Sequence, residues 1–286
     1  MAPPFLGDDR TPVSIPTGHH FWKMSGSGND FLFFDARSGP LSDISEPAVI
    51  DRICARATGV GSDGVVFIQT DTQQDFRIRY FNRDGSLGEL CGNASLCSTR
   101  LASELGIVGT GEFSFATDAG AISARFVDGE PQIDLQPPTV VTPDYTPIAR
   151  ADGERRLGFA DTGVPHVVVL LDDTSDADVL GRGAFLRNHP SLAAGANANF
   201  VAPASDGTFT IRTFERGVEG ETLACGTGAV AAAILLESWG LSGPESRLRT
   251  RSGKTLTVSL RHGDGAITPS LSGEARIVFT GQLAEI

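Results

Sequence analysis

The sequence has very little lysine: Lys23 and Lys254 are its only two, and arginine carries the rest of the positive charge. An enzyme that uses pyridoxal phosphate needs a lysine to form a Schiff base, so this class has few candidate residues here. Acidic residues also outnumber basic ones, and the formal net charge is -12 at pH 7. Nonspecific binding to nucleic acid or to anionic lipid requires a concentrated basic face. The charge balance therefore favours a small-molecule substrate as the partner, with no nucleic acid and no membrane.

Paired cysteines and long apolar runs are missing as well. The four cysteines, Cys54, Cys91, Cys97 and Cys225, form no C-x-x-C pair, so we expect neither a metal site nor a disulfide framework. No apolar run approaches the roughly 18 residues of a membrane helix, and residues 1–18 have no basic start before an apolar segment. We therefore expect a soluble, cytoplasmic protein with a loosely ordered extension at 1–18.

The chain does contain enough apolar sequence for a sizeable core, since 40% of its 286 residues are hydrophobic. Short runs that alternate in polarity or are rich in β-branched residues predict strands at 30–35, 64–69, 76–81, 121–127, 166–171, 209–214, 255–260 and 275–279. Apolar periodicity predicts helices at 46–57, 93–105, 179–187 and 227–239. This mixture predicts an α+β fold with mostly antiparallel sheets, and composition places an inter-domain connection at 143–156.

An internal repeat relates the two halves of the chain. The stretches 81–106 and 214–240 each run from a strand that ends in Phe, through a charged turn with Gly, to Cys-Gly, a helical run and a final Gly. The separation from Cys91 to Gly106 equals that from Cys225 to Gly240. The repeat therefore predicts two copies of one strand–turn–helix–hairpin unit, related by an approximate twofold axis.

Each Cys-Gly of the repeat lies where a predicted helix begins. The amino end of a helix carries about half a positive charge, which stabilises anions and lowers the pKa of a thiol from its free value of about 8.5. We therefore expect that Cys91 and Cys225 can be thiolates near neutral pH. The free N–H groups at the same helix starts are expected to bind a carboxylate.

Two opposed thiols fit one class of reaction, the inversion of a stereocentre that bears a hydrogen. One thiolate removes the proton, and the other thiol donates a proton from the opposite face. N–H donors aimed at an adjacent carboxylate stabilise the carbanion, so no cofactor is needed. A single cysteine before glycine is more often a buried apolar residue, which is what we expect of Cys54 and Cys97, but the repeat argues against chance at the other two positions.

Six fragments, in this order along the chain, resemble the diaminopimelate epimerase family: MSGSGNDFLFFD (24–35), FNRDGS (81–86), CGN (91–93), PH (165–166), NANF (197–200) and FERGVEGETLACGTGA (214–229). The resemblance implies an isomerase that interconverts LL- and meso-2,6-diaminopimelate without a cofactor, on the route to lysine and peptidoglycan. It also implies two similar domains, each a curved, mostly antiparallel sheet around a central helix. Homodimers are common in the family.

The resemblance also implies roles for individual residues. Cys91 and Cys225 would be the acid/base thiols, with His166 in support. Arg216 would pair with the distal carboxylate, while Glu215 would hold an ammonium and, with His166, influence the protonation of the thiols. The full set of expected substrate-binding residues is Asn29, Asn82, Gly92, Asn93, Asn197, Glu215, Arg216, Gly226 and Thr227.

The expected organisation is an extension at 1–18, a first epimerase-like domain at 19–140 and a second at 141–271. Residues 272–286 could return to the first domain, as the resemblance implies.

Some positions depart from the family pattern and leave other functions open. Ala94 and Leu96 stand where the family often has glycine and arginine, and Val164 stands where it has asparagine. Gly64 stands where some members have glutamine. These changes leave open a racemase of the same fold that acts on histidine, proline or hydroxyproline. A non-catalytic amino-acid-binding relative is the third hypothesis, and the presence of both cysteines argues against it.

Overall fold

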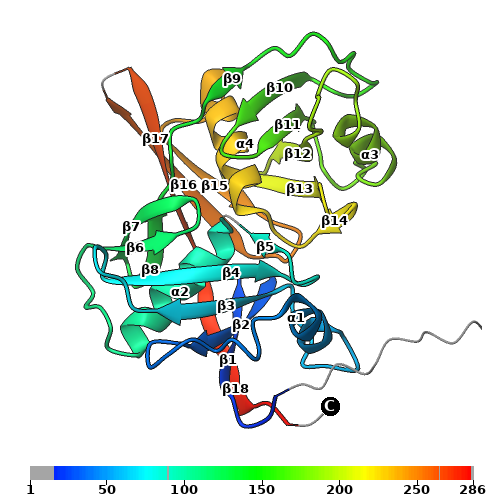
Figure 1. Ribbon diagram of the computed structural model, residues 1–286. Coiled ribbons are helices and arrows are strands. Elements are labelled where there is room, and N and C mark those ends of the chain that lie inside the picture. The colour runs from blue at the N-terminus through cyan, green and yellow to red at the C-terminus, as the bar shows by residue number, and fades with distance from the viewer. Residues whose placement is uncertain (1–15, 89, 264, 285–286) are drawn as a thin grey trace, which may run out of the picture.

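The computed structural model describes residues 16–88, 90–263 and 265–284, so most of the extension predicted at 1–18 lies outside the described residues. Figure 1 shows two lobes, one above the other, each with a long helix packed against strands. The first lobe contains β1 (His20–Gly26), β2 (Asn29–Asp35), α1 (Pro47–Cys54), β3 (Gly64–Gln69), β4 (Phe76–Asn82), β5 (Leu87–Gly88), α2 (Gly92–Glu104), β6 (Phe113–Thr117), β7 (Gly120–Val127) and β8 (Glu130–Asp134). The second contains β9 (Val140–Thr142), β10 (Arg156–Asp161), β11 (Pro165–Leu170), α3 (Gly181–Arg187), β12 (Asn197–Pro203), β13 (Phe209–Glu215), β14 (Gly220–Thr222), α4 (Gly226–Ser238), β15 (Glu245–Arg249), β16 (Thr255–Gly263) and β17 (Ala266–Gly273), and β18 (Ala275–Gln282) follows.

Every strand and helix predicted from the sequence is present. The largest difference is at α1, which ends at Cys54 because Ala55 already has an extended ψ of 126°. The stretch 143–155, inside the predicted inter-domain connection, links β9 to β10 without forming a helix or a strand. The apolar and β-branched periodicity of the chain therefore predicted these helices and strands correctly.

Both lobes have the same strand pairing. In the first lobe β1 is antiparallel to β2, β2 is parallel to β3, β3 is antiparallel to β4, and β4 is parallel to β6. In the second lobe β10, β11, β12, β13 and β15 repeat these pairings in the same order. The predicted α+β fold of two pseudo-symmetric domains is confirmed, and each mostly antiparallel sheet also contains parallel pairs.

The two lobes are joined where the chain crosses between them. β8 and β17 pair antiparallel, with Ile133 opposite Leu271. β9, which follows β8, pairs with β10 of the second lobe, and β18, which follows β17, pairs with β1 of the first lobe. Each lobe is therefore completed by a strand that follows the last hairpin of the other.

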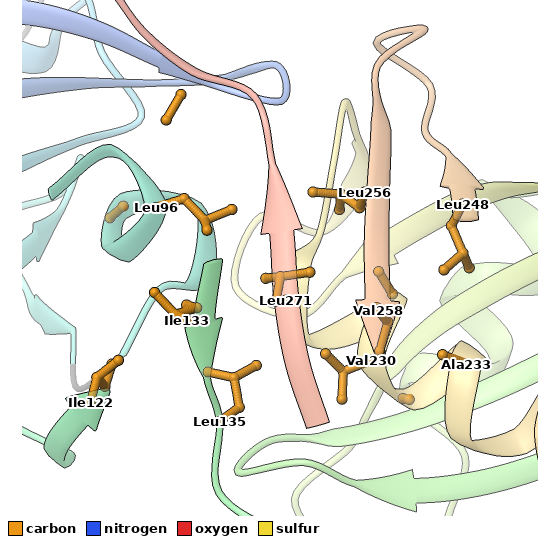
Figure 2. Packing of buried hydrophobic residues seen from close by; sticks show 14 of the residues in the cluster. Leu96, Ile122, Ile133, Leu135, Val230, Ala233, Leu248, Leu256, Val258 and Leu271 are labelled. Carbon is orange, nitrogen blue, oxygen red and sulfur yellow. The ribbon is translucent and has the colours of Figure 1, made fainter. Parts of the chain in front are cut away.

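The main hydrophobic core is continuous between the lobes. Figure 2 shows Leu271 of β17 at its centre, with Leu96 and Ile133 on one side and Leu256 and Val258 on the other. Residues 228–236 of α4 are buried on every side, as expected for an apolar helix that a sheet encloses. No helix in the described part of the chain is long and apolar enough to cross a membrane.

Candidate active site

Each of the two repeated cysteines immediately precedes a long helix. Cys91 (φ -134°, ψ 116°) precedes α2, and Cys225 (φ -136°, ψ 111°) precedes α4. Both residues are extended, each follows a short strand, β5 or β14, and a glycine then opens the helix. The two halves of the repeat thus place a thiol at equivalent points of equivalent helices.

Gly92 and Gly226 bring the two helix starts into contact. A Cβ atom added to Gly92 would lie 3.6 Å from the Cα atom of Gly226, and one added to Gly226 would lie 3.5 Å from the Cα atom of Gly92. Either added atom would also lie 3.0 Å from Cδ2 of Leu271. The two glycines thus lie against each other and against Leu271, which gathers the N–H groups and the positive ends of two helix dipoles in one place.

The candidate residues of the first lobe belong to hydrogen-bonded networks. Asn93, in the first turn of α2, donates from Nδ2 to Oδ1 of Asn29 (2.6 Å), and Asn29 donates from its own Nδ2 to Oδ2 of Asp63 (3.2 Å). Asn82, at the end of β4, accepts the hydroxyl of Tyr80 at its Oδ1 (2.9 Å). These side-chain amides are therefore held in place by neighbouring side chains of the protein.

The candidate residues of the second lobe surround Cys225. Glu215, the last residue of β13, accepts hydrogen bonds from the hydroxyl of Thr222 (2.5 Å) and from the thiol of Cys225. Asn197, the first residue of β12, accepts the backbone N–H of Arg216 at its Oδ1 (2.7 Å). The paired strands β12 and β13 thus bring an amide, a carboxylate and a guanidinium to the edge of the sheet next to α4.

Arg216 and Thr227 keep polar groups for a ligand. The guanidinium of Arg216 is partly exposed and donates from Nη1 to the carbonyl of Ala194 (3.0 Å), so its other N–H groups can bind an anion. Oγ1 of Thr227 lies 3.7 Å from Sγ of Cys225. The residues expected from the sequence therefore form two clusters, one per lobe, that meet at Gly92 and Gly226.

Burial raises the pKa of both thiols. The pKa of Cys91 rises to about 12. Burial also raises the pKa of Cys225 well above its ordinary value, and the negative charge of Glu215 adds to this effect. Burial therefore opposes the thiolate form that we expect from the two helix starts near neutral pH.

Ionisation of Glu215 makes ionisation of the two thiols less favourable. Burial raises the pKa of Glu215, against the hydrogen bonds that it accepts from Thr222 and Cys225. A charge on Glu215 in turn raises the pKa of Cys91 and of Cys225. Interacting acids of this kind titrate as a group, so a ligand that brings positive charge alters the protonation of all three.

His166, on β11, is fully buried and neutral. Its Nδ1 lies 3.1 Å from Nδ2 of Asn199, which makes Nδ1 the acceptor and leaves the proton on Nε2. Burial, followed by the positive charge of Arg216, lowers its pKa to about 3. Nε2 has no hydrogen-bond partner among the described residues, so His166 offers a neutral donor near Arg216.

Asp63 is a residue of the site that the sequence did not indicate. It lies directly before β3 and accepts hydrogen bonds from Asn29 and from Nη2 of Arg56 (2.8 Å). Its negative charge also raises the pKa of Cys91 and Glu215. The pairing of Phe31 with Gly64 brings Asp63 beside the Asn29 strand, and this register has no signature in the sequence.

Two of the departures from the family pattern lie in the core. Leu96 is fully buried in the cluster that joins the lobes, where its side chain packs against apolar neighbours. Ala94 is fully buried within α2 and belongs to the same cluster. Val164, in the turn between β10 and β11, is partly exposed.

Two lobes of one topology, whose central helices begin at a shared point, define a class of proteins known from solved structures. A hydroxyproline epimerase from Agrobacterium vitis has this fold, with a TM-score of 0.67 and 19% identity over 93% of this chain and 92% of that one. A phenazine biosynthesis protein of the PhzF family from Bacillus anthracis has a TM-score of 0.70 and 15% identity over 95% of this chain and 99% of that one. At these identities the likeness shows the fold alone.

Within this class, the chain belongs to the diaminopimelate epimerase family. The sequence model of that family matches residues 21–141 and 158–282. The diaminopimelate epimerase of Gemmatimonas aurantiaca is 49% identical over 275 residues, which cover 92% of this chain and 99% of that one. The diaminopimelate epimerase of Aquifex aeolicus is 40% identical over 279 residues, which cover 93% and 98%. The resemblance inferred from six short fragments is confirmed.

Proposed function

We propose that this protein interconverts LL- and meso-2,6-diaminopimelate without a cofactor, by proton transfer at one α-carbon. The observation that carries the proposal is the contact between two helix starts, each of which follows a cysteine. Relatives that match almost the whole chain are named diaminopimelate epimerase, which supports the choice of substrate.

Inversion at the α-carbon needs a base on one face and an acid on the other. One of Cys91 and Cys225, as thiolate, takes the α-proton, and the other, as thiol, donates its proton to the opposite face. The proton that was removed stays on the first sulfur. Each turnover therefore exchanges the protonation states of the two cysteines, and the reverse reaction uses them in the opposite order.

The N–H groups at the two helix starts stabilise the carbanion. Those of Gly92 and Asn93 on α2, and of Gly226 and Thr227 on α4, bind the carboxylate at the reacting centre. When the α-carbon loses its proton, negative charge spreads onto this carboxylate. The fixed donors therefore act most strongly in the transition state, which is the requirement for catalysis.

The remaining groups match the rest of the substrate. Glu215 holds an ammonium, and Arg216 forms a bidentate pair with the distal carboxylate. His166 offers its Nε2 proton on the Arg216 side of the site. Side-chain amides that bind the polar groups of the substrate come from Asn29, Asn82 and Asn197.

Substrate binding supplies positive charge to a site rich in carboxylates and thiols. An ammonium beside Glu215 offsets the repulsion that raises the pKa of both cysteines, so it favours formation of one thiolate. The raised pKa values of Cys91 and Cys225 keep the free thiols protonated and weakly nucleophilic until the substrate enters.

The proposed reaction belongs to the biosynthesis of lysine and of peptidoglycan precursors. These small precursors are assembled inside the cell, so we place the enzyme in the cytoplasm.

The assembly that we propose is a homodimer formed through β18. This strand pairs with β1 on one edge, and in the described part of the chain its other edge has no paired strand. Ile277, Val278 and Phe279 are exposed on it, at 36%, 45% and 47%. An exposed apolar edge strand is a template for pairing with another strand, and a second copy of β18 across a twofold axis satisfies both edges at once.

The function is tested by incubating the purified protein with LL-diaminopimelate in D2O. We expect the meso isomer to form with deuterium at one α-carbon, without any added cofactor. A racemase of the same fold, which Val164 favours, predicts instead turnover of histidine, proline or hydroxyproline in a parallel panel. A binding protein predicts retention of diaminopimelate without deuterium exchange, and either of these outcomes would contradict the proposal.

A further inference from the structure

Tyr80 lies in the site but has no part in the function described so far. It stands on β4 between Ile78, a core residue, and Asn82, a candidate substrate ligand. Two glycines on the neighbouring strands leave room for its ring. A Cβ atom added to Gly64 would lie 2.6 Å from Cε2 of Tyr80, and one added to Gly88 would lie 2.4 Å from its Cδ1. The ring is thus held in a slot that two residues without side chains create.

The hydroxyl of Tyr80 fixes the side chain of Asn82. It donates to Oδ1 of Asn82 (2.9 Å), while Nδ2 of Asn82 donates to Oγ of Ser86 (3.1 Å). The hydrogen bond from the phenol to the carboxamide oxygen fixes the orientation of the amide group of Asn82. One N–H of Asn82 then remains for a ligand.

The environment of Tyr80 keeps its hydroxyl protonated. Burial, followed by negative charge at Cys91, Asp63 and Glu215, raises the pKa of Tyr80 well above its usual range. Tyr80 and Cys91 also line the same narrow recess, together with Ile78 and Leu90. The phenol therefore remains a donor at any pH at which the site works, and it lies beside one of the two proposed acid/base thiols.

The equivalent position in the second lobe has a different partner. The segments FRIRYFNR (76–83) and FTIRTFER (209–216) align residue by residue, so Thr213 corresponds to Tyr80 and Glu215 to Asn82. Thr213 donates to Oδ1 of Asn199 (3.0 Å) and not to Glu215. The contact between Tyr80 and Asn82 is thus a feature of the first lobe alone, where an amide must be oriented.

We propose that Tyr80 is a positioning residue that orients the carboxamide of Asn82 to bind the distal carboxylate of the substrate. This inference rests on the proposed function. It assigns Tyr80 a role in substrate recognition through Asn82, with no direct part in proton transfer. Gly64 and Gly88 serve the same role indirectly, because they make room for the ring.

The test compares Tyr80→Phe, which removes only the hydroxyl, with the wild-type enzyme. A net hydrogen bond contributes about 0.5–1.5 kcal/mol, so we expect KM for diaminopimelate to rise about 2- to 10-fold. Binding that is equal in the ground and transition states affects KM and leaves kcat nearly unchanged. The other tyrosine of the chain provides the matched control, since Tyr145 donates to Ser191 (3.3 Å), and Tyr145→Phe should leave both constants unchanged.

A double-mutant cycle shows whether Tyr80 acts through Asn82. Asn82→Ala should raise KM, and adding Tyr80→Phe to it should raise KM no further, because the group that the phenol orients is gone. Gly88→Ala, which displaces the ring, should raise KM as Tyr80→Phe does. A wild-type KM for Tyr80→Phe, or additive effects in the double variant, would overturn the assignment alone. A wild-type protein that does not turn over diaminopimelate would overturn the proposed function and this assignment with it.

Discussion

At the scale of single residues, burial sets the charge of the site. The thiols lie at two helix starts, as the sequence predicted, but removal of water raises the pKa of Cys91 to about 12. The same cause acts in the opposite direction on a base, and it lowers the pKa of His166 to about 3. Neither shift can be inferred from the sequence, because both depend on how completely the fold excludes water from these side chains.

The buried His166 should make the protein less stable in acid. A depressed pKa means that the folded state resists protonation, so its contribution is complete above the unfolded value of about 6.5 and is lost as the pH falls toward 3. The free energy of unfolding should therefore decline by up to about 1.4 kcal/mol per pH unit from this residue. His166→Asn keeps an acceptor for Asn199 and should remove this slope.

Urea denaturation of both proteins between pH 7 and pH 4 measures the effect of His166. His20 is an exposed histidine at the start of β1, so His20→Asn serves as the control and should leave the slope as in the wild-type protein. Parallel stability curves for the wild-type protein and His166→Asn would show that protonation of His166 does not oppose folding.

The sequence identified the acid/base candidates but missed their neighbours. Cys91 and Cys225 were found because the repeat places them at equal distances from a closing glycine. No repeat or spacing in the sequence indicates Asp63 or Tyr80. Asp63 joins the site through the parallel pairing of β2 with β3, and Tyr80 through the space above two glycines on other strands. Both depend on contacts between distant segments, which local patterns do not encode.

At the scale of elements, close neighbours restrict which residues can stand at the starts of α2 and α4. Gly228, in the first turn of α4, shows this most clearly. A Cβ atom there would lie 2.3 Å from Oδ1 of Asn199 and 3.2 Å from Sγ of Cys225. Asn199 is buried and bonded to both His166 and Thr213, so it has little freedom to move.

Gly228→Ala should therefore destabilise the protein although alanine is the better helix former. Helix propensity alone predicts a gain of about 1 kcal/mol. The clash with Asn199 should turn this into a loss of about 1–3 kcal/mol and reduce turnover, because Cys225 shares the contact. Gly243→Ala is the control, since an added Cβ atom there meets no atom within 4 Å. A Gly228→Ala variant more stable than the wild-type protein would show that the close approach does not constrain the helix start.

Some of the strands that the sequence missed lack alternating apolar residues. β17 (AITPSLSG) mixes polar residues with Pro269, and few patterns favour a strand there. It nevertheless lies between β16 and β8, and the carbonyl of Pro269 accepts the N–H of Leu135 (2.8 Å). β12 was missed because residues 197–202 are all buried, which removes the alternation of a half-exposed strand.

At the scale of the whole molecule, the pseudo-twofold arrangement follows from the repeat, while the exchange of strands between lobes does not. No pattern in the sequence of β9 indicates that it pairs with β10, and only the family resemblance implied that the segment of β18 returns to the first lobe. β18 also leaves an exposed apolar edge. Figure 1 shows this strand at the base of the first lobe, next to β1. The proposed homodimer accounts for that edge.

A charge on β18 should prevent the proposed dimer. Val278→Lys places a positive charge on the exposed edge, which is how natural edge strands avoid pairing. Sedimentation should show a wild-type dimer and a monomeric variant. Leu180→Lys changes a residue that is 63% exposed at the start of α3 and should leave the dimer intact. A monomeric wild-type protein, or a dimeric Val278→Lys variant, would contradict a homodimer formed through β18.

The central claim is that two thiols act from opposite faces of one carbon, and α-deuterium exchange in the single-cysteine variants tests it most directly. Cys91→Ala and Cys225→Ala should each lose interconversion of LL- and meso-diaminopimelate, while Cys97→Ala, which alters a cysteine buried in the core, should retain it. Each of the two site variants should exchange the α-hydrogen of at most one stereoisomer, and the stereoisomer should differ between them. Epimerisation at the wild-type rate by either site variant would contradict the two-thiol account.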